Sequence, residues 1–178
     1  MVRTYGDKKS FLSKFTPDMQ IVVAENEERA FTGHAPSLGL LKKTYGKNMA
    51  TIWLIPQIWD LCEYTNSRGK LDERQTEKLA EMISIEYGYM KVTEIMLFFY
   101  RLKCGRYGKF YGTVDPMAIM MALDQFRTER INYLANHKEE EPPRTDTITA
   151  EEYFKRKGIS EEDQKNVKNI INNFKNDD

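Results

Sequence analysis

The segment from Lys91 to Lys103 constrains the fold more than any other part of the chain. Its positions 92, 95, 96, 99 and 102 are apolar at the i, i+3, i+4, i+7 spacing of a helix. Leu97, Phe98 and Tyr100 add large side chains on the remaining sides. A helix that is apolar all round has to be buried. We therefore expect this helix at the centre of a bundle.

Two helices are expected before it. The first covers about 36–45, with Pro36 at a first helical position and Gly46 as its stop. The second covers about 48–64 and is so densely apolar that Trp53 and Trp59 are both predicted to be core residues. Pro56 removes a backbone donor from this second helix, so we expect a kink or a break there.

Capping signals place two more helices. Asp72 with Gln75 forms a capping box for a helix that ends at Gly88. The sequence Asp115-Pro116 is an N-cap acid followed by proline, which starts a helix that runs to about Asn136.

The remaining segments frame this core. Residues 1–32 mix charges with short apolar pieces and show no helical period, which predicts a loosely held, extended N-terminal arm. Residues 138–148 contain Glu-Glu-Glu-Pro-Pro and predict a linker, and residues 149–178 carry two capping signals of a helical hairpin. The expected fold is all-α: a compact bundle of about five helices over 33–137, flanked by the arm, the linker and the hairpin.

A basic and aromatic turn follows the central helix. From Lys91 to Tyr111 the chain has five cations and one opposing acid, Glu94, although its 27 basic and 27 acidic residues cancel overall. Cations attract phosphates, and aromatic faces stack on unpaired bases. The candidate nucleic-acid contacts are Lys103, Arg106, Tyr107, Lys109, Phe110 and Tyr111. The alternative is an ordinary packed turn, in which glycines adopt positive φ and the aromatics cover helix ends.

The last predicted helix carries an apolar stripe. Its members are Val167, Ile170, Ile171 and Phe174. Such a stripe docks either on the chain's own core or in the groove of a partner protein, and the sequence alone favours neither.

The sequence shows no pattern of a catalytic or metal site. Its two histidines have no neighbouring ligand residues, its glycines match no phosphate-binding fingerprint, and its two cysteines are expected to be reduced thiols. We therefore expect a non-enzymatic protein without cofactor or metal. The longest apolar run is too short for a membrane span, and no signal peptide is visible, so the expected location is the cytoplasm.

Several short motifs together resemble a family of small helical proteins from phages and mobile elements of Bacteroides-type bacteria. They lie between about 35 and 135 and include Pro36-Ser37-Leu38, Gly69-Lys70-Leu71-Asp72, Met90-Lys91-Val92-Thr93-Glu94-Ile95 and Lys103-Cys104-Gly105-Arg106-Tyr107-Gly108-Lys109-Phe110-Tyr111-Gly112. Proteins of this kind are, more distantly, similar in architecture to helicase loaders.

The resemblance and the basic turn lead to one expected function. It is an adaptor in DNA replication in a bacterial host cell, which docks on a partner protein such as a replicative helicase and contacts single-stranded DNA. The alternative is an interaction or structural module, such as a virion component or a protein that sequesters a host factor, without any nucleic-acid role.

Overall fold

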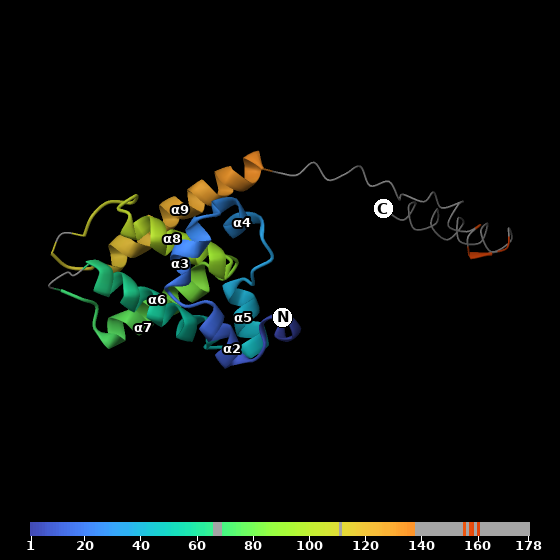
Figure 1. The fold of residues 1–178 in the computed structure, drawn as a ribbon, viewed down its shortest axis with the longest axis horizontal. Helices are drawn as coiled ribbons and strands as arrows, with labels where there is room; N and C mark the ends of the chain where they lie inside the picture. The colour runs from blue at the N-terminus through green and yellow to red at the C-terminus, as the bar shows by residue number, and fades with distance from the viewer. Residues whose placement is uncertain (66–68, 111, 138–154, 156, 159, 161–178) are drawn as a thin grey trace, which may run out of the picture. The chain divides into compact units, whose positions relative to one another are not determined.

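A computed structural model describes residues 1–65, 69–110, 112–137, 155, 157–158 and 160 of the chain (Figure 1). The chain divides into two compact units, Met1–His137 and Lys138–Asp178. The predicted linker and most of the predicted C-terminal hairpin lie outside the described residues.

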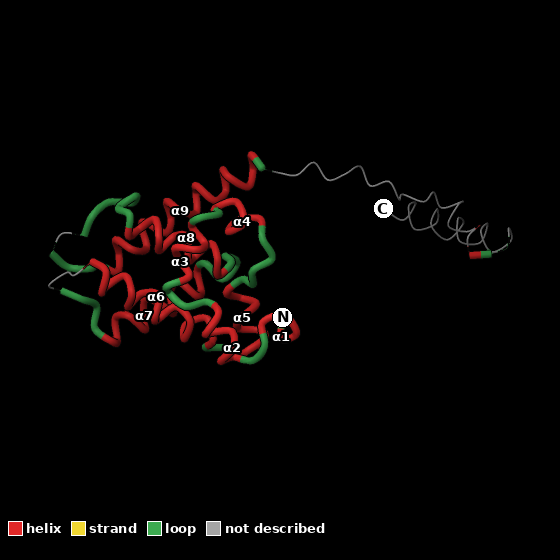
Figure 2. The backbone as a smooth tube through the Cα atoms, in the orientation of Figure 1, coloured by secondary structure: helices red, strands yellow, loops and turns green. Residues whose placement is uncertain are grey.

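The described part of the chain contains nine α-helices and no β-strand, which confirms the all-α prediction (Figure 2). The helices are α1 (Val2–Tyr5), α2 (Lys8–Lys14), α3 (Met19–Ala24), α4 (Glu27–Thr32), α5 (Leu38–Tyr45), α6 (Met49–Thr65), α7 (Glu73–Glu86), α8 (Val92–Lys103) and α9 (Pro116–Asn136).

Helix α8 lies at the centre of the first unit, as its composition predicts. It packs against α3 and α4, against α6 and against α9. Met96, Leu97 and Phe98 are fully buried, although successive residues of a helix point to different sides of it. Each side of α8 therefore has its own cover from another part of the chain.

The prediction of an extended N-terminal arm is wrong. Residues 2–32 form four short helices, and Phe11 and Phe31 from this region belong to the core. Polar contacts also join this N-terminal layer, α1–α4 with the turns between them, to α6. The Trp53 indole donates to the Phe15 carbonyl (2.8 Å), and the buried Gln20 amide donates to the Gln57 side chain (2.7 Å). Helices of four to seven residues are too short to show a sequence period, which is why the pattern was missed.

Two predictions about α6 need correction. The helix continues through Pro56 without a break. The carbonyl four residues earlier belongs to Ile52, which is exposed, so water can take the place of the missing donor. Trp59 is 51% exposed, whereas Trp53 is 1% exposed. Only one of the two tryptophans is thus a core residue.

The predicted caps are present. Asp72 and Gln75 form a reciprocal capping box, and the Asp115 carboxylate accepts the N–H of Met117 at the start of α9. The starts of α5 and α8 lie side by side, because Leu38 N–H donates to the Met90 carbonyl and Val92 N–H donates to the Pro36 carbonyl, both at 2.9 Å. The backbone near these starts is so close that a Cβ at Gly39 would lie 3.0 Å from the Gly88 oxygen.

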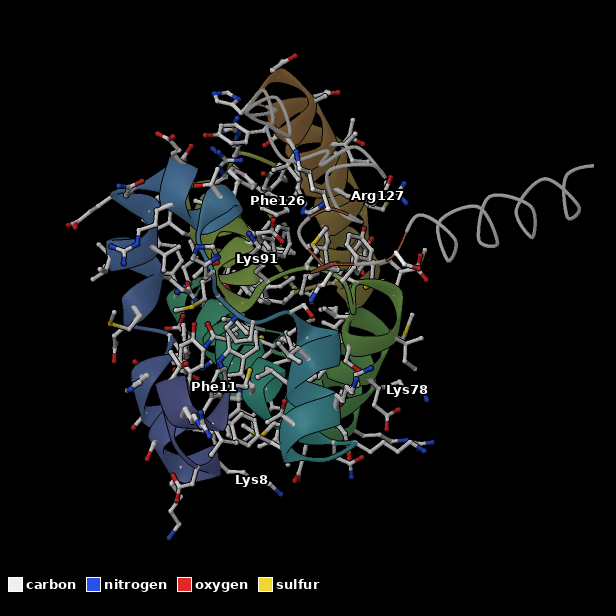
Figure 3. All side chains as sticks on the ribbon, turned by 90° about the vertical axis from the view of Figure 1, so that its right-hand side faces the viewer. Lys8, Phe11, Lys78, Lys91, Phe126 and Arg127 are labelled. Carbon is white, nitrogen blue, oxygen red and sulfur yellow. The ribbon has the colours of Figure 1, made fainter. Side chains whose placement is uncertain are left out.

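Lys91, labelled in Figure 3, joins the start of α8 to the end of α4. Lys91 lies in the middle of the first unit, between the levels of Phe11 and Phe126. Its ammonium donates to the carbonyls of Phe31 (2.6 Å) and Gly33 (2.7 Å), at the end of α4. The residue that starts the central helix therefore also holds the last turn of α4.

Candidate functional site

The turn after α8 is built by its own backbone. Gly105 has φ +78°, its N–H donates to the Leu102 carbonyl, and the Arg106 N–H donates to the Arg101 carbonyl. These two bonds form a Schellman motif, which ends a helix at a residue in the left-handed region. Gly105 therefore ends α8, and its positive φ agrees with the alternative of a packed turn.

Two of the three candidate cations are paired with acids. The Lys103 ammonium contacts the Asp60 carboxylate of α6 and lies 5.6 Å from the ring centre of Tyr64. The Arg106 Nε lies 3.4 Å from an oxygen of Glu129 on α9. The local charge excess in the sequence is therefore offset by carboxylates that arrive from distant parts of the chain.

The candidate aromatics also have protein partners. The Tyr107 ring stacks on Phe98 at 5.9 Å between centres, and its hydroxyl donates to Glu129 (3.1 Å). Burial raises the pKa of Tyr107 to about 12. Phe110 is half-buried against the core, and Tyr111 lies outside the described residues. Tyr107 would have to leave Phe98 before its ring could stack on a base.

Lys109 differs from the other two cations. It is exposed, and it has no hydrogen bond or ion pair with any residue that the structure describes. It follows Gly108, whose φ is +104°. Of the predicted nucleic-acid contacts in the described turn, Lys109 is the cation with an uncommitted ammonium group.

A buried arginine beneath the turn was not singled out from the sequence. The side chain of Arg101 is 9% exposed and forms ion pairs with Glu27 (2.6 Å) and Glu129 (2.8 Å). Its guanidinium also lies 5.8 Å and 5.7 Å from the ring centres of Phe31 and Phe126. The available signal was a lone arginine within an apolar helix, because a buried cation requires acidic partners.

About two helical turns before Arg101, a second charged residue of α8 contacts α9. Glu94 is fully buried and accepts hydrogen bonds from the Lys91 backbone and from the Arg130 guanidinium, both at 2.8 Å. Burial raises the pKa of Glu94, while the Lys91 N–H and Arg130 act against that shift. Together with Arg101, this pair orients α9 on α8, so both groups have a structural role.

An apolar groove lies between α7 and α9. It has a volume of about 670 Å³ and is lined by Met82, Ile85, Glu86, Tyr87, Met120, Met121, Asp124 and Gln125. Ile85 is 75% exposed, Met121 is 64% exposed and Met82 is 47% exposed. No sequence pattern indicated this surface, so it is a finding of the structure. We call it the α7–α9 groove.

The groove has acidic edges. Glu86 lies at the end of the α7 wall and has no ion pair with a described residue. Asp124 lies on the α9 wall and pairs with Arg127 one turn further along (2.7 Å). The groove therefore combines apolar walls with two acids, of which Asp124 is paired and Glu86 has no ion pair with a described residue.

The other predicted sites can be placed only in part. The predicted partner-binding stripe, Val167, Ile170, Ile171 and Phe174, lies outside the described residues.

Cys62 is buried and Cys104 exposed, and both are free thiols. Within the described ranges no group of three His, Cys, Asp or Glu residues is arranged to hold a metal ion, and no helix has both the length and the apolar character to cross a membrane.

Comparison with known proteins yields a family. No curated protein and no solved structure matches the chain. A family model, described as a family of unknown function, matches residues 70–166. This stretch includes α7, α8 and α9, and hence the turn after α8 and both walls of the groove. Because the match covers more than half of the chain, the protein belongs to this family, DUF6633.

Proposed function

We propose that the protein is a non-enzymatic adaptor that binds an amphipathic helix of another protein in the α7–α9 groove. The observation that carries this proposal is the groove itself, with three large apolar side chains left uncovered. Contiguous apolar patches on a folded protein typically mark interaction sites. Of the two functions expected from the sequence, the interaction module thus gains the stronger support.

The shape and composition of the groove favour a helix as the occupant. Its walls are two helices, α7 and α9, and amphipathic helices bind in such grooves through apolar anchors at i, i+3/i+4 and i+7. Met82, Met120 and Met121 supply flexible side chains that adapt to different anchors.

Charge narrows the choice of partner. Glu86 and Asp124 lie at the edges of the groove. A helix with Lys or Arg beside its apolar stripe would place cations next to these acids, whereas an acidic helix would be repelled. The proposed partner is therefore a basic amphipathic helix.

The biological setting of the proposal comes from the resemblance to phage and mobile-element proteins. A replicative helicase or another replication protein in the bacterial cytoplasm would supply the helix. The other expected setting, a virion component or the sequestration of a host factor, uses the same groove and differs only in the identity of the partner.

A defined probe tests the groove directly. The probe is a fluorescent peptide of about 18 residues, or five helical turns, with Leu anchors and Lys flanks. We expect binding by fluorescence anisotropy, and a loss of at least about tenfold in the Ile85→Glu and Met121→Glu variants. Ile131→Glu is the matched control, because Ile131 is exposed on α9 outside the groove.

Two peptide controls complete the test. Replacing the Leu anchors by Gln should abolish binding, and replacing the Lys flanks by Glu should weaken it. Equal binding of the three peptides, or equal binding by the groove variants and Ile131→Glu, would overturn the proposal. Capture from the native host with and without nuclease then identifies the partner, which should be lost with Met121→Glu and retained after nuclease treatment.

A second candidate function is contact with single-stranded nucleic acid at the turn after α8. The observation that favours it is the uncommitted ammonium of Lys109, next to the half-exposed Arg106. Lys103 is 15% exposed and paired with Asp60, whereas Arg106 is 50% exposed and its contact with Glu129 is longer (3.4 Å). We therefore expect two phosphate contacts, from Arg106 and Lys109, and a log-log salt slope of about −1.4, from about 0.7 counterions released per contact on a single strand.

The variants Arg106→Ala and Lys109→Ala together should remove this slope, whereas Lys9→Ala, an exposed lysine of α2, should leave it unchanged. Failure of an oligonucleotide to bind at low salt would assign the turn a structural role alone.

A further inference from the structure

A second cavity lies on the N-terminal layer, apart from the α7–α9 groove. It has a volume of about 520 Å³ and lies between α3, α4 and the segment around His34. This volume is within the usual range of small-molecule sites, roughly 300 to 1,000 Å³. We call it the α3–α4 pocket.

The walls of the pocket are mostly apolar. Phe15, Val23 and Ala30 belong to the core or pack against it, and Met19 and Val22 line the pocket from α3 while remaining partly exposed to solvent. An apolar ligand body in this space would cover Met19 and Val22, and the removal of that surface from water favours binding.

Around the pocket a side-chain amide donor has no partner among the described residues, whereas nearby backbone carbonyls already accept hydrogen bonds from other residues of the chain. The Asn26 side-chain oxygen already accepts the Arg29 backbone N–H (2.9 Å), so its NH₂ group is left to donate. The Ala30 carbonyl accepts the Thr93 hydroxyl (2.9 Å), and the Gly33 carbonyl accepts the Lys91 ammonium (2.7 Å).

Arg29 supplies the charge. Its guanidinium forms no ion pair or side-chain hydrogen bond with a described residue, and Arg29 and His34 are both lining residues of the pocket. The base of its side chain lies next to Gly33, where an added Cβ would be 3.4 Å from the Arg29 Cγ. Arg29 and Asn26 both line the pocket and offer a guanidinium and an amide NH₂, and a carboxylate can accept hydrogen bonds from both groups.

We propose that the α3–α4 pocket binds a small amphiphilic carboxylate, with its apolar body against Val22 and Val23 and its carboxylate on Arg29 and Asn26. This site is independent of the proposed docking of a helix, because it uses α3 and α4 and none of the groove residues.

Decanoate below its micelle concentration is the probe, with decanol as the neutral partner of equal chain length. We expect saturable 1:1 binding of decanoate to the full chain by calorimetry. Methyl signals of Val22, Val23 and Ala35 should shift in NMR spectra, and those of Ile85 and Met121 in the groove should not.

Variants separate the carboxylate from the apolar body. Arg29→Met should weaken decanoate binding by about ten- to hundredfold, the loss of a charge-assisted hydrogen bond, and leave decanol binding unchanged. Arg74→Met, an exposed arginine of α7, is the matched control for charge. Val22→Trp should weaken both ligands by filling the pocket.

The proposal is overturned by any of three results. These are an absence of saturable decanoate binding, equal affinities for decanoate and decanol, and equal effects of Arg29→Met and Arg74→Met. The methyl shifts are measured on the unmodified protein, so they decide the location of the site even if Val22→Trp fails to fold.

Discussion

Arg101 of α8 and Glu129 of α9 form an ion pair of 2.8 Å on which both the core and the turn after α8 depend. The two oxygens of Glu129 also receive the Tyr107 hydroxyl and the Arg106 guanidinium. Since Glu27 holds the other side of Arg101, two carboxylates from α4 and α9 compensate one buried cation.

Replacing these two acids should have a more than additive effect. Glu27→Gln and Glu129→Gln should each lower the free energy of unfolding by about 1 to 2 kcal/mol, because one carboxylate still faces Arg101. The double variant should lose more than the sum and reach about 3 to 5 kcal/mol, because the guanidinium is then buried without a counterion. Urea unfolding measures all four states of the cycle.

The control for this cycle is Glu63→Gln, whose exposed ion pair with Lys70 should contribute less than about 1 kcal/mol. Simple additivity of the Glu27 and Glu129 variants would show that water compensates Arg101 when both acids are gone.

Truncating the core phenylalanine of α8 should be costly. Phe99 is fully buried, so Phe99→Ala should lower the free energy of unfolding by about 3 to 5 kcal/mol. Ile85→Ala, at an exposed position, should change it by less than about 0.5 kcal/mol. Equal losses for the two variants in urea unfolding would contradict the central place of α8.

Tyr107 should make stability depend on pH in the alkaline range. The fold raises the pKa of Tyr107 from an ordinary value of 10.0 to about 12, so the folded state favours the neutral phenol. Its contribution should be fully present below about pH 10 and lost as the pH rises through about 12.

Urea unfolding of the wild type and Tyr107→Phe between pH 9 and pH 12 measures this effect, with the wild type losing its advantage as the pH rises. Because the chain has ten tyrosines, the difference in absorbance between the two proteins isolates the titration of Tyr107. A difference spectrum with a midpoint at pH 10 would show that the phenol is not shielded.

The first unit should fold without the residues after His137. All buried apolar side chains that the structure describes lie at or before Phe126. A chain that ends at His137 should therefore melt within about 2 °C of the full chain, as expected for a change well below 1 kcal/mol. Insolubility, or a loss of near-ultraviolet circular dichroism, would mean that the later residues complete the core.

Local signals in the sequence were sufficient for the longer helices. The apolar residues on nearly all sides of 91–103 placed α8 at the centre, and Asp72 with Gln75 and Asp115 with Pro116 marked the starts of α7 and α9. Each of these signals depends on residues within one or two turns, so no knowledge of the tertiary structure was needed.

The candidate site depended on contacts that local signals do not contain. Asp60 and Glu129 are 43 and 28 residues away from Lys103 and Arg101, respectively. Because these acids are so far away in the sequence, the sequence of the basic turn does not show that carboxylates pair with its cations. Trp59 was misplaced on similar grounds, because the apolar density of α6 does not show which face the neighbouring helices cover.

The central position of α8 has a consequence for the evolution of the family. The family match begins at Lys70, yet α3, α4 and α6, which cover much of α8, all precede that residue. The stretch recognisable by sequence therefore lacks the first half of the compact unit Met1–His137. Related chains need an equivalent cover for this helix, either from a divergent N-terminal region or from a permanently associated second protein.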